Sequence, residues 1–88
     1  HVGEAFRGVI SGVTEFGLFV ELPCTVEGLV HITNLDDDFY VYDEKQYALI
    51  GRRRRKVYRL GDPARVRVVK ADVDTRKIDF ELLAEQSS

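Results

Sequence analysis

The sequence contains a single cysteine, Cys24, among its 88 residues. No disulfide can therefore form within the chain, which fits a reducing compartment. One cysteine and two histidines lack the ligand spacing of a zinc site, so we expect no bound zinc. Cys24 lies in the loop-forming stretch LPCTVEG without a neighbouring base, which argues against a nucleophilic thiol.

Long hydrophobic runs are also missing. No apolar stretch approaches the roughly 18 residues that a membrane-spanning helix needs. The start, HVGEAFRG, lacks the basic region followed by an apolar region that marks a signal peptide. These absences predict a protein without a membrane partner and with a cytoplasmic location. The length predicts one domain over residues 1–88.

The net charge of −2 hides an uneven distribution. From Arg52 to Lys70 the sequence has nine lysines or arginines and one acid, Asp62. The acids gather elsewhere, for example in the DDD run at 36–38. Separated charge of this kind predicts a local positive field on a protein that is acidic overall.

Apolar and polar residues alternate with a period of two. In ARVRVVKA at 64–71 two valines face one side and two arginines the other, and RKIDFEL at 76–82 alternates in the same way. Turn-rich stretches separate these segments, and glycines inside the first one indicate a bend or bulge. Five short strands of this kind are typical of a small all-β barrel. The expected strands cover about 4–13, 17–22, 27–32, 64–71 and 76–83.

Aromatic residues are expected on the outside of this barrel. In GLFVEL at 17–22, Phe19 shares a face with Glu21, and a glutamate rarely faces a small core. The same alternation turns His31 outward, and Phe16 lies in the turn before the second strand. Taken singly, each of these side chains also has a structural interpretation, since exposed aromatic residues are common. Together with nearby basic residues they are typical of proteins that bind single-stranded nucleic acid.

Four motifs stand out along the chain: GVISGVTEFGLFV at 8–20, GLVH at 28–31, LGD at 60–62 and DVDTRKI at 72–78. Together they resemble the S1 RNA-binding domain, a five-stranded OB-fold barrel. The resemblance covers nearly the whole chain and implies a set of RNA-facing positions. Carried over to this sequence, they are Phe16, Phe19, His31 and Asp74, with Arg76 and Lys77 as alternatives for one basic position. Asp74 is also expected to shape its turn.

The connection over residues of about 36–60 is longer than in most such domains, and its two β-prone runs predict an extra hairpin between strands 3 and 4. This insert and the ending KIDF resemble the C-terminal S1 domain of the bacterial ribonuclease R family. The resemblance implies a parent 3′-to-5′ exoribonuclease whose catalytic domain, absent from this chain, uses magnesium and clustered aspartates. It implies no cofactor or small-molecule substrate here, and two partners: single-stranded RNA and the other domains of the parent ribonuclease.

The run RRRRK has two interpretations. It is either a solvated loop tip or an auxiliary electrostatic contact for RNA, and five cations in an acidic domain favour the contact. The four tyrosines of this region, in contrast, are expected to pack the hairpin onto the barrel. The auxiliary residues are Arg52, Arg53, Arg54, Arg55 and Lys56, and the tyrosines are Tyr40, Tyr42, Tyr47 and Tyr58.

Catalytic motifs are not found. The sequence has no Gly-rich phosphate loop and no Ser/His/Asp arrangement, so we expect a binding domain rather than an enzyme. Three successive carboxylates at 36–38 point to alternate sides and do not predict a metal site. The rival hypothesis is a protein-interaction module that docks another domain or a ribosome-associated partner through a strand edge or the acidic patch. OB-folds also bind oligosaccharides, but such a ligand would give the basic residues no role.

Overall fold

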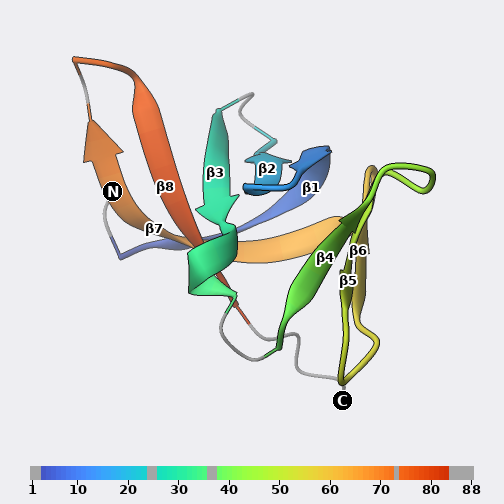
Figure 1. The fold of residues 1–88 in the computed structure, drawn as a ribbon. Helices are drawn as coiled ribbons and strands as arrows, with labels where there is room; N and C mark the ends of the chain where they lie inside the picture. Colours follow the sequence, from blue (N-terminus) through green and yellow to red (C-terminus); the bar gives the residue numbers. More distant parts are fainter. Residues whose placement is uncertain (1–2, 24–25, 36–37, 73, 84–88) are drawn as a thin grey trace.

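Five strands form a closed barrel with the order β1-β2-β3-β8-β7 (Figure 1). The structure is a computed structural model that describes residues 3–23, 26–35, 38–72 and 74–83. The predicted five-stranded barrel is confirmed, and every predicted strand lies within two residues of an observed one. The barrel strands are β1 (Ala5–Thr14), β2 (Gly17–Glu21), β3 (Glu27–His31), β7 (Pro63–Asp72) and β8 (Lys77–Leu82).

The last strand completes the barrel by inserting between β3 and β7. It pairs in parallel with β3 and antiparallel with β7, while β1 pairs antiparallel with both β2 and β7. Two register shifts bend the long strands. One lies between Ile10 and Gly12 in β1, where glycines predicted a bend, and one between Val68 and Lys70 in β7. Such bulges increase the local twist, as closure of a small sheet requires.

Alternate residues of each strand fill the barrel interior. Phe80 of β8 is completely buried, and the aliphatic residues around it come from all four other strands. Burial of each such side chain is worth roughly 1.5–3 kcal/mol. The largest fully buried side chains are Phe80, Ile10, Leu18, Leu49, Val20, Val30 and Val66.

The insert forms a second, three-stranded antiparallel sheet of the order β4-β5-β6. It contains one strand more than the predicted hairpin. A short 3-10 turn, η1 (Ile32–Asn34), follows β3 and leads toward β4 (Tyr40–Asp43), β5 (Ala48–Gly51) and β6 (Val57–Arg59). The sheet joins the barrel core through buried Leu49 and Tyr40.

Three of the four tyrosines pack as expected. Tyr40 is buried, and Tyr42 and Tyr58 are partly buried against the core. The rings of Tyr40 and Tyr58 lie 5.5 Å apart between centroids. The prediction is wrong for Tyr47, whose side chain is exposed at a turn with a φ of 51°.

Some predictions lie outside the described residues, namely those on Cys24 and on the first two aspartates of the DDD run. Within the described ranges, the structure has no helix with the length and apolar character needed to cross a membrane.

Candidate nucleic-acid interface

A groove lies on the outer face of the barrel across β2, β3 and β8. Phe19 stands directly opposite Leu29, and Leu29 directly opposite Asp79, so the three residues form one row across these strands. The groove has a volume of about 420 Å³. Four of the six predicted RNA-facing residues line it: Phe19, His31, Arg76 and Lys77.

Phe19 is half-buried because its ring covers Gly12 of the neighbouring strand. The two residues are paired in the β1–β2 register. A methyl group on Gly12 would lie 3.3 Å from the Cδ2 atom of Phe19, tighter than an ordinary contact. Because Gly12 has no side chain, the ring of Phe19 can lie against the backbone of β1 at this position, and it lines the groove as predicted.

His31 is held by a carboxylate of the last strand. Its Nε2 atom lies 3.0 Å from Oδ1 of Asp79, with side-chain exposures of 44% and 33%. A carboxylate is an acceptor, so Nε2 of His31 donates its hydrogen. This hydrogen bond fixes the orientation of the imidazole ring in the groove.

Asp72, rather than Asp74, shapes the loop between β7 and β8. The Asp72 carboxylate accepts the backbone N–H groups of Asp74, at 3.0 Å, and Thr75, at 3.3 Å. These contacts, first those from Thr75, lower the pKa of Asp72, and Lys70 adds to the effect. The lowered pKa keeps the carboxylate ionised and the cap complete at neutral pH, and the cap is lost only as the pH falls through that lowered pKa. The turn contacts that the structure shows thus come from Asp72, whereas the turn-shaping role was predicted for Asp74; Asp74 does not line the groove, and its role in RNA binding stays a prediction.

Two cations, Arg76 and Lys77, line one end of the groove. Arg76 has a φ of 56°, in the left-handed region that non-glycine residues occupy at a cost of roughly 1–2 kcal/mol. Lys77 is the first residue of β8 and lies on its exposed face. The sequence left these two residues as alternatives, and the structure places both of them at the groove.

Phe16 lies beside the groove but does not line it. The side chain is 68% exposed. The backbone is fixed, because its N–H donates to Oγ1 of Thr14 at 3.1 Å and its carbonyl accepts the N–H of Ile32 at 2.8 Å. Its role in RNA binding stays a prediction.

The run of arginines forms the loop between β5 and β6, and all five of its basic side chains are exposed. Asp38 caps this loop, accepting the N–H groups of Arg54 at 2.7 Å and Arg53 at 3.0 Å. Partial desolvation would raise the pKa of Asp38, but these donors, the N–H of Phe39 and the Arg53 charge together lower it. The loop lies at the lower right of Figure 1, at the opposite corner of the view from the β7–β8 loop. An RNA strand would have to cross the barrel to touch both.

Five further residues that line the groove were not predicted as site residues: Glu27, Gly28, Leu29, Ile78 and Asp79. Alternation already turned Asp79 outward, yet only the parallel pairing of β3 with β8 brings it to His31. Glu27, whose carboxylate accepts a hydrogen bond from the Ser11 hydroxyl, gives the groove a negative edge. Among the described residues no group of three or more His, Cys, Asp or Glu could hold a metal ion.

Comparison with known proteins yields consistent relatives. The chain is 49% identical over 86 residues to ribonuclease R 1 of Lactococcus lactis, covering 98% of this chain and 10% of that protein. It is 51% identical over 86 residues to ribonuclease R of Thermotoga maritima, covering 97% and 12%. The solved structure of Mycoplasma genitalium RNase R in complex with ribose methylated single-stranded RNA matches with a TM-score of 0.86 and 31% identity, over 93% of this chain and 13% of that one.

The chain thus spans about a tenth of the length of the ribonuclease R sequences that it matches. The family description "S1 RNA binding domain" matches it over residues 1–83. This match includes all five barrel strands and every residue of the groove, and it confirms the resemblance inferred from the motifs. The chain belongs to the S1 RNA-binding domain family.

Proposed function

We propose that this chain is a single-stranded RNA-binding module of a ribonuclease R-like 3′-to-5′ exoribonuclease. The observation that carries the proposal is the groove, in which Phe19 and His31 lie beside Arg76 and Lys77. Bases stack on exposed rings for roughly 1–3 kcal/mol each, and cations follow the phosphates. Stacking uses the π-face that every base has, so the groove would bind RNA with little sequence preference.

The left-handed backbone at Arg76 supports the same proposal. Glycine would occupy this conformation without strain. An arginine here gives up backbone stability and places a guanidinium at the groove, where it would contact a phosphate. Lys77 would add a second phosphate contact.

In the parent enzyme this module would hold RNA for a catalytic domain outside the chain, in the cytoplasm. That domain would supply magnesium-dependent hydrolysis, and no residue of this chain is assigned to the metal. The high identity to ribonuclease R sequences supports this assignment. The partners would be single-stranded RNA and the neighbouring domains of the enzyme.

Fluorescence anisotropy of this chain with single-stranded and duplex RNA of one sequence tests the function. At about 50 mM salt we expect binding of the single strand and little binding of the duplex, because only unpaired bases expose their faces for stacking. At about 200 mM salt the affinity for the single strand should fall, since cation–phosphate contacts release counterions. Equal binding of duplex and single strand would contradict the stacking mechanism, and binding of neither would favour a protein partner.

The arginine loop is expected to add phosphate contacts only on long RNA. A variant with Arg52, Arg53, Arg54 and Arg55 changed to glutamine should flatten the salt dependence for a strand of about 12 nucleotides, by about 0.7 in log–log slope per lost contact. A strand of about four nucleotides, at the low end of OB-fold site sizes, should bind unchanged in the distant groove. If this variant keeps the wild-type salt dependence on the long strand, the loop makes no phosphate contact and serves only to keep the protein soluble.

A further inference from the structure

A second hollow lies at the other end of β8 from the groove. Lys77 and Asp79, near the start of the strand, line the groove, whereas Leu82 and Leu83 line the second pocket together with residues of β6 and β7. A strand rises about 3.3 Å per residue, so Lys77 and Leu83 lie roughly 20 Å apart along β8. The two hollows are therefore arranged along one strand.

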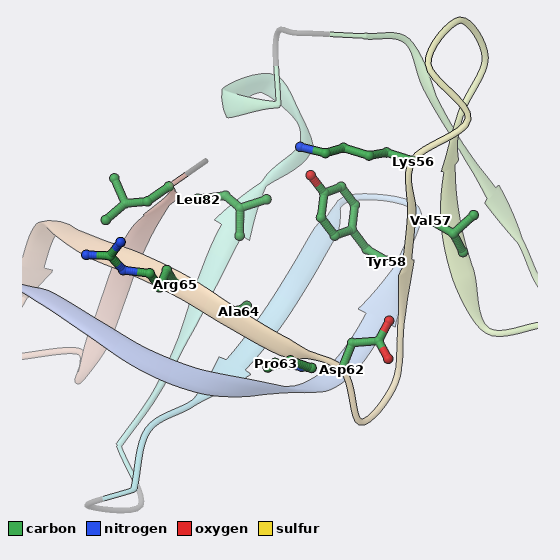
Figure 2. A pocket seen from close by; sticks show the side chains of 9 residues that line it. Lys56, Val57, Tyr58, Asp62, Pro63, Ala64, Arg65 and Leu82 are labelled. Atoms are coloured by element: carbon green, nitrogen blue, oxygen red, sulfur yellow. The ribbon is translucent and has the colours of Figure 1, made fainter. Parts of the chain in front are cut away.

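Two cations border this pocket, Lys56 on the β6 side and Arg65 on β7 (Figure 2). Lys56 extends over Tyr58, with its Nζ atom 6.0 Å from the ring centroid, whereas the Arg65 side chain runs along β7 with its guanidinium directed away from Lys56. The pocket also contains one acid, Asp62, whose carboxylate accepts the N–H of Arg59 at 3.2 Å. The pocket thus combines net positive charge, an aromatic ring and the apolar side chain of Leu82.

The register of the barrel places another cation directly opposite Arg65. Arg7 of β1 and Arg65 of β7 are paired, and both are exposed. Like charges directly opposite each other on paired strands destabilise a sheet. A phosphate group at this position would offset the repulsion.

The two acids on the surface between the hollows each have a basic neighbour. The outer face of β8 carries two acids on this path, Asp79 and Glu81, and each contacts a side chain of a neighbouring strand. Asp79 lies 3.0 Å from His31, and Glu81 lies 3.7 Å from Arg67. An RNA strand that leaves the groove at its His31 end would follow the outer face of β8 and turn over the end of this strand into the pocket, because Leu82 lies on the core-facing side of β8.

We infer that this pocket is a second RNA subsite, which holds one nucleotide of the strand bound in the groove. Its two flanking phosphates lie at Lys56 and at Arg65, one at each, and the base between them lies against Tyr58 and Leu82. The volume, about 250 Å³, is below the roughly 300–1,000 Å³ of sites for independent small molecules, as expected for a subsite of a longer ligand. The inference rests on the proposed function, because the strand must first occupy the groove.

A charge-neutralised variant tests the subsite. Lys56→Gln/Arg65→Gln should weaken binding of a 12-nucleotide strand about tenfold at 50 mM salt and reduce its log–log salt slope by about 1.4, for two phosphate contacts. A strand of about four nucleotides fills only the groove and should bind as it does to the wild-type chain. Both affinities are measured by fluorescence anisotropy.

The matched control is Lys45→Gln/Arg59→Gln, which removes one exposed lysine and one exposed arginine that do not line the pocket. It should leave the affinity for both strands unchanged. An equal loss in the control, a loss on the short strand, or wild-type affinity of the pocket variant for the long strand would overturn the subsite alone. If the wild-type chain binds neither strand, both the subsite and the proposed function fail.

Discussion

Gly17→Ala is expected to lower the free energy of unfolding by at least about 3 kcal/mol. A methyl group on Gly17 would lie 2.0 Å from the carbonyl oxygen of Val30 and 3.1 Å from Cα of His31. These neighbours are backbone atoms of β3, so they cannot rotate away as a side chain would. Overpacking usually costs about 1–3 kcal/mol, and a clash with backbone at this distance belongs at or above the upper end. Urea denaturation measures the change.

Gly61→Ala is the matched control. Gly61 also has a positive φ, 91°, but a methyl group there would meet no atom within 4 Å. This variant should lose only the roughly 1–2 kcal/mol of stability that a left-handed backbone conformation costs a residue other than glycine. If the two variants have the same stability, the close approach of β2 to β3 at Gly17 is not what restricts this position.

Phe19→Ala is expected to lose about 1–3 kcal/mol of RNA-binding free energy, which is roughly a 5- to 150-fold rise in Kd. The ring lines the groove beside His31, and alanine offers a base no surface for stacking. Fluorescence anisotropy with a four-nucleotide single strand measures the loss. Because Phe19 also covers Gly12, circular dichroism and urea denaturation must confirm that the barrel remains folded.

Two further variants separate stacking from packing. Phe19→Leu keeps an apolar side chain over Gly12 but removes the flat ring, so its affinity should fall nearly as far as that of the alanine variant. Phe39→Ala removes an equally large ring that is 70% exposed and does not line the groove, and it should bind normally. Unchanged affinity in a folded Phe19→Ala variant would remove this residue from the interface.

Strand alternation predicted the barrel well because one face of every strand is buried. Leu18 and Val20 pack inside while Phe19 turns out, and a register slip of one residue would reverse this arrangement. The same rule predicted the outward direction of Lys77. Local pattern therefore contained most of the information about which residues face the groove.

Non-local pairing and loop geometry were beyond the reach of the sequence. The contact of His31 with Asp79 depends on which strands become neighbours, and no short-range pattern encodes the parallel β3–β8 pairing. In the β7–β8 loop, Asp72 and Asp74 both have side chains suited to an Asx turn, and only the backbone path selects Asp72. The third strand of the insert, β6, was not predicted because it follows directly on the run of basic residues, where no clear strand pattern is visible.

The parallel pairing of β3 with β8 also makes the binding surface depend on closure of the barrel. Leu29 pairs with Asp79, 50 positions further along the sequence, and β1 must find β7 over a similar span. Such distant pairings carry a large loop-closure entropy and place small barrels among the slower single domains, which fold in roughly milliseconds to seconds. Arg76, Lys77 and Asp79 join Phe19 and His31 only when β8 enters the barrel. The groove therefore exists only in the closed barrel, and a chain whose hairpins have formed but whose barrel is open would have no RNA site.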